Sequence, residues 1–67
     1  MTDSIKLKGK IVGSGYTITS LAKELHMSKP TLSQKVNNKI KFSQENIREI
    51  SKILNLTGDE IKEIFLN

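Results

Sequence analysis

The stretch TITSLAKELHMSKPTLSQKVNNK, residues 17–39, decides the fold of this 67-residue chain. Its apolar residues recur every three or four positions, which indicates helix and not strand. Thr17 is a candidate N-cap for a first short helix. Pro30 suits the first turn of a second helix, because an N–H there would have no helical partner. The N-cap of that second helix is either Ser28 or Lys29, since proline pushes the preceding residue toward extended backbone.

Two short helices joined by only a few residues must cross steeply, and they need a small residue where they approach. Ala22 supplies it, and we expect an apolar wedge between the helices from Leu21, Leu25, Met27, Leu32 and Val36. The second helix then projects a polar surface without any acid, formed by Lys29, Pro30, Thr31, Ser33, Gln34, Asn37 and Asn38. Such side chains suit the DNA major groove: Gln or Asn pairs with adenine, Lys with guanine, and a Thr methyl with the thymine methyl.

Three further helices are predicted around this unit. One starts near Ser4 and ends at the glycines of residues 13–15, with Leu7 and Ile11 on its inner face. Another runs from residue 43 to residue 55, and the last follows a capping box at residues 57–60. In the linker of residues 39–42 we expect two side chains to enter the core, those of Ile40 and Phe42. The prediction is an all-α, compact five-helix domain over residues 1–67, with a helix-turn-helix unit at residues 17–38.

Composition narrows the classes of function that the chain can have. The chain has no cysteine and one histidine, which excludes disulfides and the common zinc sites, and no nucleophile–base pair is visible. We therefore expect no enzyme, no metal and no cofactor. Residues 1–41 hold eight lysines and two acids, whereas residues 42–67 hold three basic and five acidic residues. This asymmetry is typical of a surface that meets a polyanion, although a solvated lysine-rich surface gives the same count.

No apolar run is long enough to span a membrane, and the first residues, MTDS, do not resemble a signal peptide. We therefore expect a soluble domain in the cytoplasm of a bacterial cell, with no membrane partner.

The residues of 17–39 resemble the helix-turn-helix domains of the Cro and repressor type from temperate phages. The chain looks especially like the small single-domain Cro-like and repression-modulator proteins of phages of Gram-positive bacteria, and the five-helix layout extends the resemblance over residues 5–66. The resemblance implies a lambda-repressor-like fold in which the helix after Ser28 enters the major groove of double-stranded DNA. Positions that match base-facing sites are Lys29, Pro30, Ser33, Gln34 and Asn37. We add Thr31 as a sixth base-facing residue, because its methyl group suits the thymine methyl. Positions that match phosphate-facing sites are Thr17, Thr19, Ser28, Asn38 and Lys39.

Two positions depart from that family. Ile18 stands where the family usually has a phosphate-contacting Gln, and His26 stands where glycine is usual in the turn. Histidine is one of the residues enriched at positive φ, so the turn is still feasible. Lys29 suits phosphate or guanine equally well. The lysines at residues 6, 8 and 10 form either a solvated helix face or a contact to the DNA backbone.

Two functions follow from these observations. The first is a DNA-binding transcriptional regulator of the phage lysis–lysogeny switch. The C-terminal helix is its candidate surface for forming a homodimer. The second is a repression modulator, or antirepressor, that binds a phage repressor protein through exposed apolar groups near Leu66 and part of Phe65.

Overall fold

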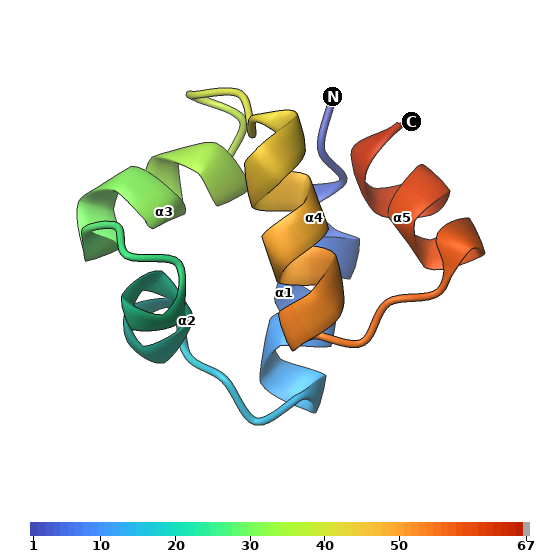
Figure 1. Ribbon diagram of the computed structural model, residues 1–67. Helices are drawn as coiled ribbons and strands as arrows, with labels where there is room; N and C mark the ends of the chain where they lie inside the picture. The colour runs from blue at the N-terminus through green and yellow to red at the C-terminus, as the bar shows by residue number, and fades with distance from the viewer. Residues whose placement is uncertain (67) are drawn as a thin grey trace.

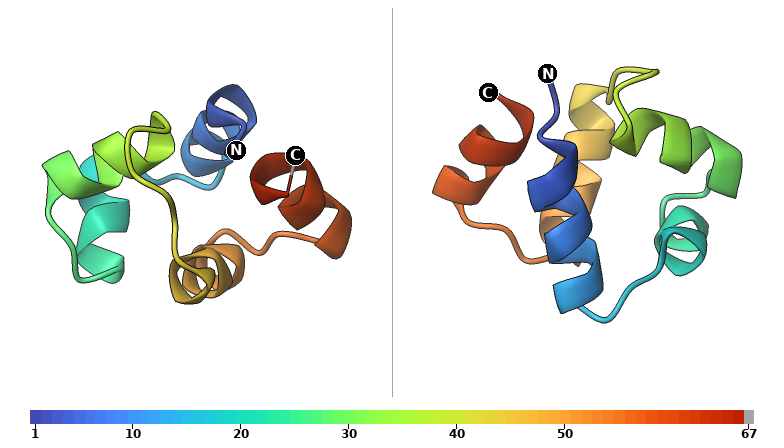
Figure 2. Two further views of the ribbon diagram at one scale, coloured as in Figure 1. Left: turned by 90° about the horizontal axis from the view of Figure 1, so that it is seen from above. Right: turned by 180° about the vertical axis from the view of Figure 1, so that it is seen from behind.

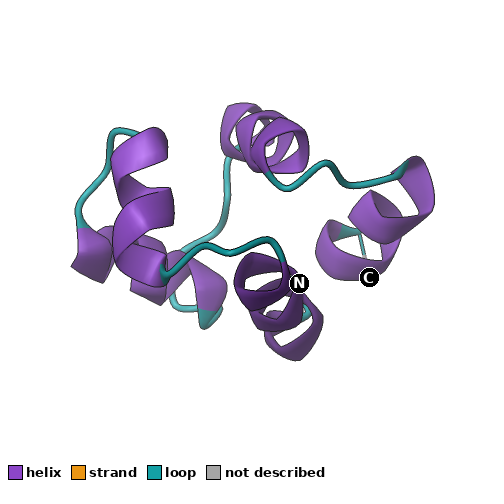
Figure 3. Cartoon of the chain, turned by 90° about the horizontal axis from the view of Figure 1, so that it is seen from below, coloured by secondary structure: helices purple, strands orange, loops and turns teal. Residues whose placement is uncertain are grey.

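The computed structural model describes residues 1–66, which form five α-helices and contain no strand (Figure 1). The predicted all-α, five-helix fold is confirmed. The helices are α1 (Ser4–Gly13), α2 (Ile18–Glu24), α3 (Lys29–Val36), α4 (Gln44–Ile53) and α5 (Gly58–Phe65). Short loops join consecutive helices (Figure 3).

Each helix begins at a polar N-cap whose side chain accepts a hydrogen bond from a backbone N–H in the first turn. Ser28 is the N-cap of α3, which decides between Ser28 and Lys29. The predicted N-cap of α1, Ser4, is wrong. Asp3 takes that position, and its carboxylate accepts from the Lys6 N–H at 3.1 Å. The Ser4 hydroxyl instead donates to the Val36 carbonyl at the end of α3, a long-range contact that no local pattern predicts.

The first four helices all end in the same reversal of the chain. A residue in the left-handed region follows each C-cap, at Gly15 (φ 82°), His26 (φ 56°), Asn38 (φ 64°) and Asn55 (φ 55°). After α2, for example, the Met27 N–H donates to the Ala22 carbonyl at 3.0 Å. This is the Schellman arrangement, which gives partners to the last carbonyls of a helix and turns the chain sharply. His26 therefore fills the turn as predicted.

The core is aliphatic and draws on every helix. Its buried members are Leu7, Ile11, Leu21, Ala22, Leu25, Leu32, Val36, Ile50, Leu54, Ile64 and Phe65. Phe42 is half-buried and packs edge-on against Phe65, with ring centroids 5.5 Å apart, as expected for a side chain that enters the core. The same expectation for Ile40 is wrong, because Ile40 is 43% exposed. The N–H groups of Lys39 and Ile40 both donate to the Gln34 carbonyl, which winds the chain tightly around the end of α3 and keeps Ile40 at the surface.

The helices are arranged around a central pair. The unit of α2 and α3 lies on one side of α1 and α4, and α5 lies on the opposite side (Figures 1 and 2). The two ends of the chain lie near each other in all of these views. Among residues 1–66, no helix combines the length and the apolar character needed to cross a membrane.

Candidate nucleic-acid interface

The outer face of α3 is polar and open. Leu32 and Val36 are fully buried and anchor the inner face of the helix. Because an α-helix turns 100° per residue, the opposite face carries positions spaced by three and four. Those positions are Pro30, Ser33, Gln34 and Asn37, of which Ser33 is half-buried and the others are exposed. Four of the six predicted base-facing residues therefore share one face, which points away from the core and from α5.

The side chains on this face are held differently. Gln34 makes no side-chain hydrogen bond within the described residues, so its amide is open to solvent. Asn37 folds back along α3, where its Nδ2 donates to the Ser33 carbonyl at 2.9 Å and lies 3.5 Å from the Ser33 hydroxyl. Its Oδ1 has no hydrogen-bond partner among residues 1–66. Gln34 is thus the side chain on this face with a full set of donors and acceptors available.

The remaining two predicted base-facing residues flank this face at the start of α3. Lys29 is exposed in the first turn. Thr31 is half-buried, and its hydroxyl accepts from the Ser28 hydroxyl at 2.8 Å. Thr31 therefore offers an outside partner both its methyl group and the O–H donor that the bond from Ser28 leaves unused.

Three of the predicted phosphate-facing residues lie at the starts of α2 and α3. Thr17 and Ser28 are exposed N-caps, and each hydroxyl accepts a backbone N–H, from Ser20 at 3.0 Å and from Thr31 at 3.3 Å. Thr19 is exposed in the first turn of α2.

The other two, Asn38 and Lys39, follow the end of α3. Lys39 is exposed and its ammonium group is free of hydrogen bonds within the described residues. Asn38 is different, because its side chain binds the chain's own amino-terminal segment: Oδ1 accepts from the Thr2 N–H at 2.9 Å and Nδ2 donates to the Thr2 carbonyl at 2.7 Å. The structure therefore gives the Asn38 side chain an intramolecular partner.

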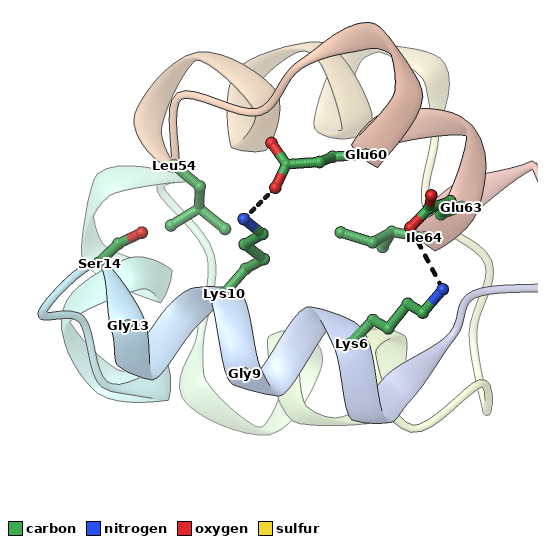
Figure 4. Close-up of a pocket in the computed structure, with 9 residues that line it drawn as sticks. All are labelled: Lys6, Gly9, Lys10, Gly13, Ser14, Leu54, Glu60, Glu63 and Ile64. Atoms are coloured by element: carbon green, nitrogen blue, oxygen red, sulfur yellow. Dashed lines mark hydrogen bonds and ion pairs between the residues drawn. The ribbon is translucent and has the colours of Figure 1, made fainter.

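Charge pairing separates the two sides of the molecule. Within residues 1–66, the salt bridges are Lys6–Glu63, at 3.2 Å, and Lys10–Glu60, and both join α1 to α5 (Figure 4). They line a cleft of about 450 Å³ whose walls include Gly9, Gly13 and Ile64. Lys6 and Lys10 are thus paired with carboxylates on the side opposite α3.

The lysines around the helix-turn-helix unit lack such partners in the described part of the chain. Residues 17–41 hold five lysines and a single acid, Glu24. The exposed lysines of this region are Lys23, Lys29, Lys39 and Lys41. Unpaired lysines clustered beside a polar helix favour contact with a polyanion over a balanced surface.

One lysine has a role that the sequence pattern did not indicate. Lys35 is half-buried, and its Nζ donates to Asn46 Oδ1 at 3.0 Å and to the Lys41 carbonyl at 3.4 Å. It therefore joins α3 to the start of α4. The sequence gives only a partial signal for this contact, a serine N-cap at residue 43 with Asn46 three residues later. That spacing predicts where the Asn46 side chain lies, but it does not predict that Lys35 binds it.

One family model matches the whole of the chain. Residues 1–67 match the family described as "Protein of unknown function (DUF739)". The chain belongs to this family, whose description assigns no activity. No curated protein matches the chain.

Proposed function

We propose that this protein is a sequence-specific DNA-binding regulator whose α3 reads the major groove, in the manner of the phage Cro and repressor domains that residues 17–39 resemble. The observation that carries the proposal is the outer face of α3. It combines exposed hydrogen-bonding side chains, above all Gln34, with a buried apolar inner face that packs the helix against the core. A short helix of this kind, presented after a tight turn, has the size and chemistry that the groove requires.

Electrostatics supports the approach to DNA. Lysines without acidic partners surround α3, whereas Lys6 and Lys10 are paired on the far side. Each lysine that meets a phosphate releases condensed counterions, so affinity falls as salt rises, with a slope of about −0.9 per phosphate neutralised. Base contacts then discriminate sequences at ~1–3 kcal/mol for each good bidentate pair. One 8-residue helix makes few such contacts, and a two-fold dimer with half-sites about one helical turn apart would supply more.

The test begins with selection of preferred duplexes from a random library by the purified protein, followed by fluorescence anisotropy titrations. Gln34→Ala is expected to relax the preference at a specific base pair by roughly tenfold or more. Gln44→Ala is the matched control: this exposed glutamine lies in the first turn of α4 and is expected to leave the ranking of sequences unchanged. An unaltered base preference in Gln34→Ala removes Gln34 as a reader. Failure to enrich any sequence contradicts the proposed function.

Lysine substitutions test the orientation on DNA. Lys39→Gln is expected to reduce the magnitude of the salt slope by about 0.9, because a phosphate contact is lost. Lys62→Gln, an exposed lysine of α5 on the opposite side, removes the same charge and is expected to leave the slope near its original value. Equal effects of the two changes would mean that α3 does not face the duplex.

A second function, modulation of a phage repressor by direct binding, is favoured by exposed apolar side chains on α1 and at the end of α5. Leu66 is 69% exposed, and on α1 Ile5 is 85% and Val12 is 73% exposed. Phe65 is only 6% exposed, so the part of the hypothesis that used its ring has no exposed surface to rest on. A gel shift with this protein alone and then with the repressor separates the functions. A supershift that requires the repressor favours the second function, and a shift by this protein alone favours the first.

A further inference from the structure

The Asn38 side chain fastens the end of α3 to the amino-terminal segment, residues 2–4. Its Oδ1 accepts from the Thr2 N–H at 2.9 Å, and its Nδ2 donates to the Thr2 carbonyl at 2.7 Å and to the Ser4 hydroxyl at 3.3 Å. An asparagine amide has two N–H donors, and both are used here. A phosphate oxygen can only accept, so this side chain has no donor left for it in the arrangement observed.

The same segment makes two further hydrogen bonds, one to α3 and one to α5. The Ser4 hydroxyl donates to the Val36 carbonyl in the last turn of α3. The Asp3 N–H donates to the Ile64 carbonyl of α5 at 2.7 Å. Residues 2–4 therefore form a strap between the end of α3 and the end of α5, and Asn38 is the side chain that closes it.

The strap acts at the end of α3, a point that Lys35 also ties to α4 through Asn46. The inner face of this 8-residue helix has two fully buried anchors, Leu32 and Val36, and the second of them lies in the last turn. Helix ends open locally at low cost unless contacts hold them. Lys39, directly after Asn38, and Gln34, whose carbonyl accepts from the Lys39 N–H at 2.8 Å, both depend on the geometry of this end.

We propose that Asn38 is a positioning residue for DNA recognition, which sets the end of α3 through the strap of residues 2–4 and does not itself contact phosphate. The inference rests on the proposed function of α3. It assigns to Asn38 a role different from the phosphate contact that the resemblance to Cro and repressor domains implies. Its consequence is that the amino-terminal segment controls affinity without touching the duplex.

The structure offers a matched pair of variants. Asn38 and Asn55 both follow a helix end with positive φ, 64° and 55°, and both are exposed, but Asn55 makes no side-chain hydrogen bond in the described part of the chain. Glycine adopts this conformation freely, so Asn38→Gly and Asn55→Gly remove a side chain without adding backbone strain. Of the two, only Asn38→Gly removes hydrogen bonds of the strap, those to Thr2 and Ser4.

DNA titrations over a range of salt concentrations test the proposal. Asn38→Gly is expected to weaken binding to the preferred duplex by roughly threefold to tenfold, the scale of one or two lost hydrogen bonds, with an unchanged salt slope. Asn55→Gly is expected to bind as the natural protein does. A slope reduced by about 0.9 in Asn38→Gly would reveal a direct phosphate contact and overturn the proposal. Unchanged affinity in Asn38→Gly would overturn it as well.

A double-mutant cycle with Ser4→Ala adds a readout that a phosphate contact would not move. Ser4 lies in the strap, and Ser4→Ala removes its bonds to Val36 and Asn38 while leaving both Asn38 bonds to Thr2 in place. If Asn38 acts through the strap, Ser4→Ala weakens binding too, and the effects of the two changes are not additive. Additive effects, or a silent Ser4→Ala, would contradict the proposal.

Hydrogen exchange measures the strap without DNA. Asn38→Gly is expected to accelerate exchange of the Thr2 amide at least tenfold relative to the natural protein and to Asn55→Gly, and an unchanged rate overturns the strap. If the natural protein binds no duplex at all, the proposed function fails and with it the role of Asn38 in recognition. Exchange at Thr2 then still decides whether the strap exists, so the two failures are distinguishable.

Discussion

At the scale of single residues, backbone conformation at the helix ends is the feature most open to measurement. His26 has a φ of 56° and an exposed side chain in the turn between α2 and α3. An L-residue in the left-handed region costs about 1–2 kcal/mol, which glycine avoids, although glycine loses more entropy on folding. We therefore expect His26→Gly to raise the free energy of unfolding by about 1 kcal/mol or slightly less. Thermal denaturation followed by circular dichroism should show a melting temperature higher by ~4–8 °C per kcal/mol for a domain of this size.

Gly15 allows the reverse substitution to be tested, from glycine to a residue with a Cβ. Gly15 has a φ of 82°, and a Cβ placed on it would meet nothing within 4 Å. Because sterics with neighbours play no part, Gly15→Ala is expected to destabilise through the backbone alone, by about 1 kcal/mol. A higher melting temperature for Gly15→Ala, or a lower one for His26→Gly, would contradict this account of the turns.

What sequence reasoning can see at this scale is local. The caps Thr17 and Thr57 and the left-handed His26 follow from the chemistry of a few neighbouring residues, so they were predictable. The cap of α3 stayed open between Ser28 and Lys29 until the structure placed it at Ser28. Asp3 and Ser4 are both good N-cap residues, and local propensity does not separate them. The structure separates them through the distant Val36 carbonyl, which takes the Ser4 hydroxyl.

At the scale of elements, the junction of α1 and α5 depends on charge. Glu60 accepts hydrogen bonds from Lys10 and from the Thr57 N–H, and these lower the pKa of its carboxyl group below the ordinary 4.5. A carboxylate with a lowered pKa stabilises the folded state above its unfolded-state pKa, and this contribution is lost as the pH falls through the folded-state value. Glu60→Gln keeps an acceptor for the Thr57 N–H but removes the charge. We expect the variant to have a lower melting temperature at pH 7 and a smaller further loss between about pH 5 and pH 3.

Glu49→Gln is the control for that experiment, because Glu49 lies in α4 and has no salt bridge or side-chain hydrogen bond in the described residues. It should retain the acid dependence of the natural protein. High salt should shrink the difference between Glu60→Gln and the natural protein at pH 7, since ions screen a partly exposed pair. An identical pH profile for Glu60→Gln and the natural protein would remove the Lys10–Glu60 pair as a source of stability.

The helices themselves were predictable because caps and apolar spacing act within single elements. The polar face of α3 follows from the same spacing once Leu32 and Val36 are assigned to the core. The connection after α3 was less predictable: Phe42 and Ile40 alternate with lysines in the same way, yet only Phe42 meets a partner, Phe65 from the far end of the chain. Tertiary packing decides between two side chains that the local pattern treats as equal. For the same reason the pattern could not find the Asn38 strap or the Lys35–Asn46 contact.

At the scale of the whole molecule, stability and the candidate interface share the same few residues. A 67-residue domain has a stability of roughly 3–10 kcal/mol. Leu32 is fully buried and holds α3 against the core, and Leu→Ala in a core costs about 2–5 kcal/mol. We expect Leu32→Ala to lower the melting temperature by about 4–8 °C for each kcal/mol lost, and to weaken DNA binding because less of the protein is folded. Ile5→Ala, on a residue that is 85% exposed, is expected to stay within about 0.5 kcal/mol of the natural protein.

Saturating preferred duplex should partly restore the Leu32→Ala fold, because a ligand that binds only the folded state stabilises it. If Leu32→Ala melts within a few degrees of the natural protein, α3 is not anchored as described, and its outer face is not the rigid surface that base recognition requires.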